Sequence, residues 1–479
     1  MAREHFLVVA FPGQGHINPA RALAARLARA TGARVTLSAA VSAHRLMFPS
    51  LGAPDEEVHD GAISYVPYSD GYDSGFSLFS GGGDGAWGHV ETFERVGRET
   101  FTGVLERLDG RGEPATRVIH AIGMYWAAEV ARERGVPCVQ YWIQPATMLA
   151  VYYHYLHGYE ELVTEHAAEP EFAVTMPGLP PMAIRDLPSF FTNKTDGTLA
   201  ALFFGIRRTV QQLDIERSSS KTGAKPMVLV NTVDALEASV ITSLPELDVI
   251  PVGPAVVSLV GDGGNGGVPI AARDLYKHDE KDYMEWLDTK PTRSVVYVSF
   301  GSMSAVSKRQ KEEMRRGLAA SGRPYLWVVR KDSRDSDAAG GDLAAEQGMV
   351  VEWCDQVRVL SHPAVGCFVT HCGWNSTLES VSCGTPVVAV PQWSDQDTNA
   401  RLVVEWGVGV RATVAADRVL EVDELIRSLG MVMGDSEKAA AIRTSSATWK
   451  AKVQEAMAKG GSLDQNLNSF LNKIAHDAA

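Results

Sequence analysis

A histidine and a glycine turn follow one strand-like apolar run in the second half of the chain. Residues 367–370 form the run, His371 follows it, and a helix-forming stretch begins after the turn. Backbone N–H groups at a helix N-terminus, helped by the helix dipole, bind anions such as a diphosphate. Asn375 and Ser376 would add further donors. The same pattern also fits a capping box of Ser376 and Glu379, which starts a helix without any ligand.

A second histidine follows the first strand-like run, residues 5–11. Asn18 before Pro19 is typical of a helix start, because proline is favoured at the first helical position. This predicts a helix from Pro19 and places His16 in the loop before it, where the positive helix end would lower the pKa of the imidazole. A neutral imidazole can act as a general base at pH 7. The alternative is a loop histidine that only packs against its neighbours.

Strand-like runs and helix-length amphipathic stretches alternate along the whole chain. The runs are continuously apolar, which is typical of parallel sheets covered by helices on both faces. With 479 residues, the chain exceeds what one hydrophobic core usually serves, so we predict an α/β protein with two doubly wound domains. The expected strands are 5–11, 34–40, 117–121, 136–142, 227–231, 294–299, 325–330, 349–353, 367–370 and 386–390, and the expected helices include 19–30, 127–134, 308–320 and 399–406.

A glycine-rich stretch without sustained periodicity follows Gly253-Pro254 and is typical of a flexible linker. Ligands of doubly wound sheets bind at the carboxyl ends of the strands, so two facing domains would form a cleft with one substrate on each side. We expect an N-terminal acceptor-binding domain at 1–252, a linker at 253–281, a C-terminal donor-binding domain at 282–458, and a helix at 459–479 that packs back on the N-terminal domain.

The bulk composition limits the partners. The net charge is −13, and no cluster of lysine and arginine appears, which argues against a nucleic acid or an anionic membrane. No apolar run approaches the roughly 18 to 20 residues of a membrane span. The five cysteines lack the repeated spacing of a disulfide framework or a zinc site. We expect a small-molecule partner, no metal, and a monomer in the reducing cytoplasm.

The segment from Trp353 to Gln396 joins these features into one pattern. Its sequence, WCDQVRVLSHPAVGCFVTHCGWNSTLESVSCGTPVVAVPQWSDQ, resembles the plant secondary-product signature of the family 1 UDP-dependent glycosyltransferases without a gap. The resemblance implies the GT-B fold, two facing Rossmann-like domains with a cleft between them. It also implies inverting transfer of glucose from UDP-glucose to a hydroxyl or carboxyl of a small plant metabolite. Residues 142–162 resemble the subgroup that glucosylates anthocyanins at O5 and indole-3-acetate.

The resemblance assigns roles along the donor. Trp353 would stack on the uracil, and Gln356 with Glu379 would hold the ribose hydroxyls. Asp395 and Gln396 would bind the sugar hydroxyls, and a final glutamine together with Trp374 favours glucose. No metal is implied, because the helix terminus and a histidine stabilise the diphosphate. The full set of expected donor-site residues is Gly15, Gly301, Ser302, Trp353, Cys354, Gln356, His371, Gly373, Trp374, Asn375, Ser376, Glu379, Asp395 and Gln396.

The resemblance also identifies His16 as the general base. Family members usually carry an aspartate after the strand at 117–121, which orients the histidine and stabilises the imidazolium as in a catalytic triad. Alignment on Trp126 places Ala121 at that position. Three explanations stay open. A water or a neighbour such as His120 replaces the aspartate, the acceptor ionises near neutral pH, or the aspartate was lost through an engineered change.

The acceptor pocket is expected in loops of the N-terminal domain. The candidates are Ile122, Met124, Trp142, Gln144 and Phe190, with ordinary core packing as the alternative for each. Two other classes of protein fit part of this pattern. A UDP-sugar epimerase or a phosphorylase shares the two-domain architecture. An epimerase, however, would not be expected to carry the signature, and a phosphorylase would need a pyridoxal lysine. A UDP-sugar-binding protein of low turnover would fit the missing aspartate.

Overall fold

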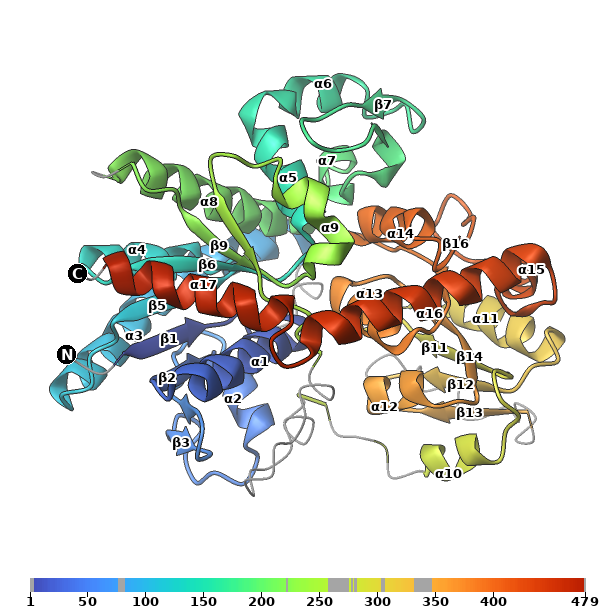
Figure 1. Ribbon diagram of the computed structural model, residues 1–479, viewed down its shortest axis with the longest axis horizontal. Coiled ribbons are helices and arrows are strands. Elements are labelled where there is room, and N and C mark those ends of the chain that lie inside the picture. Colours follow the sequence, from blue (N-terminus) through green and yellow to red (C-terminus); the bar gives the residue numbers. More distant parts are fainter. Residues whose placement is uncertain are drawn as a thin grey trace. The chain divides into compact units, whose positions relative to one another are not determined.

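The computed structural model describes residues 4–75, 82–220, 223–256, 275–276, 279, 282–302, 306–330 and 347–477. The chain forms two compact units, each built on its own sheet (Figure 1). The first unit comprises Met1–Ile184, Phe190–Leu275 and Lys459–Ala479, and the second comprises Arg185–Ser189 and Tyr276–Ala458. Most of the predicted linker, 253–281, lies outside the described residues.

The first unit contains an eight-stranded sheet in the order β10-β9-β6-β5-β1-β2-β4-β3. All neighbouring strands are parallel except the pair β3 and β4. The strand order reverses between β1 and β5, which makes their carboxyl ends the expected ligand position. The strands are β1 His5–Val9, β2 Arg34–Ser38, β3 Val58–His59, β4 Ser64–Tyr65, β5 Arg117–Ala121, β6 Cys138–Trp142, β9 Met227–Val230 and β10 Asp248–Pro251.

Helices cover this sheet. Helix α1 packs on β1 and β2, α3, α4 and α8 pack on one another, and α17 packs on β10. Trp126 of α4 is completely buried in the core and packs against Phe93 and Phe101 of α3. The helices are α1 Gln14–Thr31, α2 Val41–Met47, α3 Gly82–Gly110, α4 Tyr125–Glu133, α5 Ala146–His154, α6 Glu160–Glu165, α7 Ser189–Thr192, α8 Gly197–Ser219, α9 Asp234–Ile241 and α17 Ser462–Asp477, with short turns at Tyr155–Tyr159 and Ile184–Asp186 and a small hairpin of β7 Ala173–Val174 and β8 Met182–Ala183.

The second unit contains a six-stranded parallel sheet in the order β13-β12-β11-β14-β15-β16. Its order reverses between β11 and β14, so the turns after these strands form its expected ligand site. The elements are α10 Tyr283–Asp288, β11 Val295–Ser299, α11 Lys308–Ala320, β12 Tyr325–Val328, β13 Gly348–Val351, α12 Gln356–Ser361, β14 Val365–Thr370, α13 Trp374–Cys383, β15 Val387–Ala389, α14 Gln396–Glu405, β16 Gly409–Arg411, α15 Val422–Met433 and α16 Glu437–Met457.

The predicted start of the first helix is wrong. Helix α1 begins at Gln14, and the carbonyl of Gly13 already accepts from the N–H groups of His16 and Ile17, both at 2.9 Å. Pro19 therefore lies inside the helix. At this position proline lacks the N–H that would bond to the carbonyl of Gly15, and the helix nevertheless extends past it. His16 consequently occupies the first turn of α1 rather than a loop before it.

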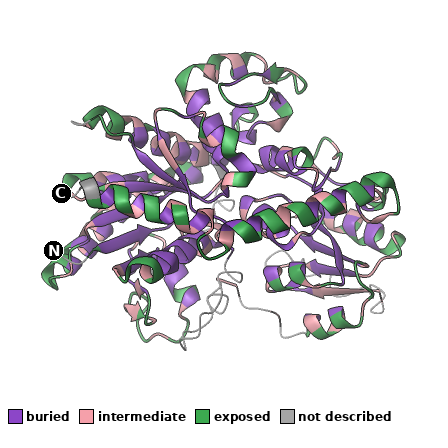
Figure 2. Cartoon of the chain, viewed as in Figure 1, coloured by how far each residue is buried: buried purple, intermediate pink, exposed green. Residues whose placement is uncertain are grey.

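Most strands are buried along their length, and most helices carry one buried and one exposed face, whereas α5 is buried on all sides (Figure 2). This matches the continuously apolar strands and the amphipathic helices predicted from the sequence. Among the helices in the described part of the chain, none has both the length and the apolar character that crossing a membrane requires.

Candidate active site

His371 lies directly after β14, between two glycines of the second unit. A Cβ atom on Gly301 would lie 2.5 Å from His371 Nε2, and one on Gly373 would lie 2.6 Å from the same atom. Gly301 also has a φ of +75°, in the left-handed region that favours glycine. Burial lowers the pKa of His371 to about 4. The imidazole is therefore neutral at pH 7 and offers one N–H donor.

The helix start after His371 was correctly predicted, but the capping-box alternative is wrong. Gly373 is the N-cap of α13, and no side chain caps this described helix end. Glu379 instead accepts from Nε2 of Gln356 at 2.6 Å, and Ser376 Oγ lies 2.9 Å from the same nitrogen. The N-terminus of α13 thus keeps the arrangement that suits an anion.

Gln356 is held in one orientation by its neighbours. Its Oε1 accepts from the hydroxyl of Tyr297 at 3.1 Å, while its Nε2 faces Ser376 and Glu379. Tyr297 is 1% exposed, so this anchor lies in the core. The structure therefore brings together the two residues expected to bind the ribose. Tyr297 was missed in the sequence because it appears only as one apolar position of a buried strand.

Trp353 and Cys354 follow β13. Cys354 is buried and its Sγ lies 3.4 Å from the hydroxyl of Tyr297. The Trp353 ring lies 4.5 Å from the ring of Tyr276 at an interplanar angle of 31°, and Tyr276 donates its hydroxyl to the carbonyl of Ser302 at 3.2 Å. Tyr276 thus extends from the residue expected to stack on the uracil to the turn expected to lie beside the phosphates. Nothing in its sequence surroundings indicated this, because it belongs to the stretch predicted as linker.

Asp395 and Gln396 lie at the start of α14. Asn399 donates through Nδ2 to Asp395 Oδ2 at 2.8 Å and to the carbonyl of Cys372 at 2.9 Å. Oε1 of Gln396 accepts from the backbone N–H of Gln392 at 2.8 Å, which leaves its amide nitrogen as a donor. The pair therefore offers one acceptor and one donor group, as binding of sugar hydroxyls requires.

His16 belongs to the first unit, where it follows β1. Its ring centroid lies 5.1 Å from that of Phe11. Burial lowers the pKa of His16 to about 4, in the predicted direction, although burial rather than the helix terminus is the cause. Its Nδ1 atom is buried and has no hydrogen-bond partner within the described part of the chain. Gly15, also predicted for the donor site, precedes it in the first turn of α1.

The family model described as UDP-glucoronosyl and UDP-glucosyl transferase matches residues 141–453. The chloroplastic crocetin glucosyltransferase of Gardenia jasminoides is 39% identical over 476 residues, covering 98% of this chain and 97% of that protein. The chain belongs to this transferase family. Anthocyanidin 3-O-glucoside 5-O-glucosyltransferase 1 of Perilla frutescens is 40% identical over 484 residues, covering 99% of this chain and 100% of that protein. The predicted resemblance is confirmed.

A solved structure supports the same family. The crystal structure of Os79 from O. sativa in complex with UDP matches with a TM-score of 0.82 at 29% identity, covering 98% of this chain and 99% of that one. The predicted GT-B class is therefore confirmed, and the chain is a glycosyltransferase that uses a UDP-sugar. The alternatives of an epimerase or a phosphorylase are wrong.

His120 is one of the groups that could replace the missing aspartate in this transferase. Ala121 ends β5 and is 1% exposed. His120 is also buried, and burial lowers its pKa to about 3. Successive residues of a strand point to opposite faces of the sheet, and among the described residues no hydrogen bond links His120 to His16. His120 is therefore a poor substitute for the aspartate.

Four of the five acceptor candidates are buried in the first unit of the transferase. Met124 and Trp142 are 0% exposed. Met124 belongs to the core around α3 and α4, and Trp142 donates through Nε1 to the carbonyl of Pro145 at 3.2 Å. These contacts favour the packing alternative. The other buried candidates are Ile122 and Phe190.

Gln144 differs from the other candidates. It is only half-buried, and its Oε1 has no hydrogen-bond partner in the described chain. Two further residues of α3, not predicted from the sequence, are linked to His16 through the ring of Phe11. The ring of Phe93 lies 5.4 Å from that of Phe11, and His89 packs on Phe93 with ring centroids 5.9 Å apart. The spacing of four between His89 and Phe93, which places both on one face of a helix, was the available signal.

The transferase shows no group of three or more histidine, cysteine, aspartate or glutamate residues that could hold a metal ion, as far as the described residues extend.

Asp395 gives a prediction about pH. Burial raises the pKa of Asp395 to about 6, so the carboxylate becomes protonated as the pH falls through 6 and loses acceptor capacity. We expect the Kd of UDP-glucose to rise several-fold between pH 7 and pH 5, while the Kd of UDP changes little. Titration calorimetry with both ligands measures this. Asp395→Asn should bind UDP-glucose weakly at both pH values, and a pH dependence retained in this variant would contradict the assignment.

Proposed function

We propose that the enzyme transfers glucose from UDP-glucose, with inversion, to a small acceptor that ionises near neutral pH. A carboxylic acid would give a glucose ester, and an acidic phenol would give a β-glucoside. The observation that carries this proposal is His16. Its imidazole is weakly basic and its Nδ1 has no hydrogen-bond partner in the described chain, while Ala121 stands at the sequence position where the family usually carries an aspartate.

The acidity of the acceptor follows from the strength of the base. A base of pKa about 4 accepts a proton from a phenol of pKa about 10 with an equilibrium constant of about 10⁻⁶. An acceptor that is already ionised at pH 7 needs no such transfer, because its oxygen is a nucleophile as it stands. The absence of the aspartate then has little effect on the rate of transfer. For such an acceptor, His16 positions the oxygen rather than deprotonates it.

The donor assignment rests on residues of the second unit. Gln356 and Glu379 would bind the ribose, and the α13 terminus with His371, Asn375 and Ser376 would stabilise the departing diphosphate. Asp395 and Gln396 would hold the glucose hydroxyls. In the proposed step, the acceptor oxygen bonds to the anomeric carbon as the bond from that carbon to the UDP oxygen breaks, and UDP leaves with the electron pair.

We also propose that the enzyme acts as a monomer in the cytoplasm, with the acceptor bound by the first unit and the donor by the second. All five cysteines are free, which suits a reducing compartment. Light scattering of the purified chain and localisation of a fluorescent fusion measure these properties. A dimer in solution, or fluorescence confined to chloroplasts, would contradict them.

The test of the function is UDP release from UDP-glucose with a graded acceptor panel. A suitable panel is a benzoic acid, a nitrophenol, an unsubstituted phenol and benzyl alcohol, which keep the ring and vary the acidity. We expect kcat/KM to fall by about 10²-fold or more from the ionised to the neutral members. Equal rates across the panel would refute the acidic-acceptor proposal. No release with any acceptor, despite UDP binding, would instead support a UDP-sugar-binding protein of low turnover.

Restoring the carboxylate gives a further prediction. In Ala121→Asp, a negative charge near His16 should raise the imidazole pKa by about 1 to 3 units and increase kcat/KM for the unsubstituted phenol about tenfold. The rate with the benzoic acid should stay unchanged. Because a base is active only above its pKa, the acid limb of the phenol pH profile should move upward from about pH 4. Ala121→Asn has the same size without the charge and serves as the control. A phenol rate increased equally by both variants would contradict the argument.

A further inference from the structure

The turn before α14 is held in a strained conformation by a segment from a distant part of the sequence. Ser394 has a φ of +64°, which costs a non-glycine residue on the order of 1 kcal/mol. Its N–H donates to Ser189 Oγ at 2.8 Å, and its carbonyl accepts from the Ser189 N–H at 3.1 Å. Both polar backbone groups of Ser394 are therefore bound to one residue. Ser394 directly precedes the two residues assigned to the sugar.

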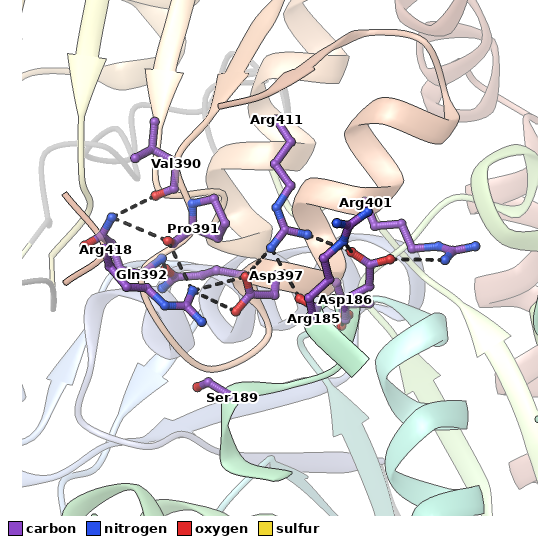
Figure 3. Close-up of polar contacts among 12 residues, drawn as sticks. Arg185, Asp186, Ser189, Val390, Pro391, Gln392, Asp397, Arg401, Arg411 and Arg418 are labelled. Carbon is purple, nitrogen blue, oxygen red and sulfur yellow. Dashed lines mark hydrogen bonds and ion pairs between the residues drawn. The ribbon is translucent and has the colours of Figure 1, made fainter. Parts of the chain in front are cut away.

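An ion-pair chain fastens the same segment to the same turn (Figure 3). Asp186 accepts from Arg411 Nη1 at 2.7 Å, and Nη2 of Arg411 donates to Asp397 at 2.5 Å. Arg418 donates to both oxygens of Asp397, at 3.1 and 2.9 Å. On the other side, Arg401 pairs with Asp186 at 3.4 Å. Two carboxylates thus alternate with arginines between the Arg185–Ser189 segment and α14.

The ion-pair chain and the Arg185–Ser189 segment together contact both ends of the turn before α14. Arg418 reaches the carbonyl of Pro391 at 3.4 Å, at the beginning of the turn. Thr398, in the first turn of α14, donates its hydroxyl to the carbonyl of Asp186 at 2.7 Å. With Ser189 on Ser394, the segment therefore holds the turn at its middle and at its end. A turn fixed in this way presents its two sugar-binding side chains in one orientation.

The two carboxylates of these ion pairs are shielded from solvent. The side chain of Asp397 is 2% exposed and that of Asp186 is 13% exposed. Solvent and salt screen such pairs much less than exposed ones. Removing one partner of a buried pair leaves the other charge uncompensated, which costs more than the loss of a surface pair.

The contacts end on one part of the donor site. The hydrogen bonds and ion pairs of Asp186 and Ser189 described above are all made with residues between 391 and 418. None of them is made with a residue assigned to the uracil, the ribose or the diphosphate. Disturbing the segment should therefore change how the sugar is held and leave the nucleotide unaffected. A residue important only for folding would change both.

We propose that Ser189 and Asp186 are positioning residues for the sugar end of the donor site. They hold the turn through Ser394 and the ion-pair chain, so that Asp395 and Gln396 meet the glucose hydroxyls in the correct orientation. The sugar-dependent part of donor binding, and the preference among UDP-sugars, is then set in part by a segment that lies about 200 residues earlier in the sequence. This inference rests on the proposed use of UDP-glucose.

The first test replaces the serine. Ser189→Ala removes the acceptor of the Ser394 N–H, and we expect the Kd of UDP-glucose to rise about fivefold, the effect of one lost hydrogen bond, with the Kd of UDP unchanged. Ser189→Thr keeps the hydroxyl and should bind both ligands as the natural chain does. Ser321→Ala is the matched control, because Ser321 Oγ also accepts a backbone N–H, from Arg323 at 3.2 Å, away from the turn. An equal loss for UDP and UDP-glucose would overturn the inference.

The second test neutralises the carboxylate. Asp186→Asn keeps the shape and the backbone carbonyl but removes the charge that Arg411 and Arg401 bind. We expect a smaller ratio of kcat/KM for UDP-glucose over UDP-galactose, by about threefold to tenfold, with an unchanged Kd of UDP. Glu312→Gln, which breaks the exposed pair with Arg315, should change neither value. A donor ratio equal to that of the natural chain in both Ser189→Ala and Asp186→Asn would refute the inference.

The two proposals fail differently. If the natural chain releases no UDP from UDP-glucose with any acceptor, the proposed function is wrong. The positioning role is judged separately, on whether Ser189→Ala changes the ratio of the two Kd values while Ser189→Thr and Ser321→Ala do not. Thermal unfolding of each variant, with a Tm close to that of the natural chain, shows that the comparison is made between folded proteins.

Discussion

His16→Ala is expected to lower kcat/KM for an unsubstituted phenol by about 10²- to 10⁴-fold, the range of a lost general base. The same change should lower the rate with a benzoic acid by less than about tenfold, because an ionised acceptor needs no proton transfer. The Kd of UDP should stay nearly the same, since all of the proposed donor-site residues except Gly15 lie in the second unit. Initial rates of UDP release with both acceptors, together with calorimetry for UDP, measure these quantities.

The control for this prediction is His59→Ala. His59 is an exposed histidine of the same unit, whose Nδ1 lies 3.2 Å from Ser64 Oγ, and its loss should leave both acceptors unaffected. Equal losses for the phenol and the benzoic acid in His16→Ala would show that the histidine only positions the acceptor. A large loss of UDP affinity would show that it belongs to the donor site instead.

Local chemistry explains which features the sequence predicted well. The continuously apolar run before His371 and the glycine after it specify a strand, a turn and a helix, and the structure contains β14, Gly373 and α13 at these positions. Each of these signals acts between residues that are close in sequence. The predicted helix at 308–320 matches α11 for the same reason, since Ser307 caps it through the Gln310 N–H.

Two predictions from local sequence patterns were wrong: the helix start at Pro19 and the capping box of Ser376 and Glu379. Proline is favoured at the first helical position, yet Pro19 lies inside α1, which begins at Gln14. Ser376 and Glu379 have the spacing of a capping box, yet Gln356 engages both. Gln356 comes from another helix, and a pattern within one helix contains no information about it.

Contacts over long sequence separations were beyond prediction. Ser189 and Ser394 are joined by two hydrogen bonds across about 200 residues, and neither has a neighbour pattern that indicates the other. The same holds for Asp186 and Arg411, which in sequence look like ordinary surface charges. The proposed donor-site residues between Trp353 and Gln396 therefore followed from the signature, whereas the residues proposed to position them were found only in the three-dimensional structure.

Gly301→Ala is expected to weaken the binding of UDP and of UDP-glucose about 10- to 100-fold, which corresponds to the loss of one hydrogen bond to a charged group. The new Cβ would lie 2.5 Å from His371 Nε2, so the imidazole must leave its position between the two glycines. The backbone strain of alanine at a positive φ adds a loss of stability on the order of 1 kcal/mol. Calorimetry with UDP and thermal unfolding separate the two effects.

Gly322→Ala isolates the strain. Gly322 has a φ of +67° and an added Cβ there would meet nothing within 4 Å, so this variant should lose similar stability and keep its UDP affinity. His371→Ala completes a double-mutant cycle with Gly301→Ala. If the glycine acts through the imidazole, the double variant should bind UDP no more weakly than His371→Ala alone. Additive losses would mean that Gly301 contacts the nucleotide independently, and an unchanged affinity in Gly301→Ala would remove His371 from the phosphate site.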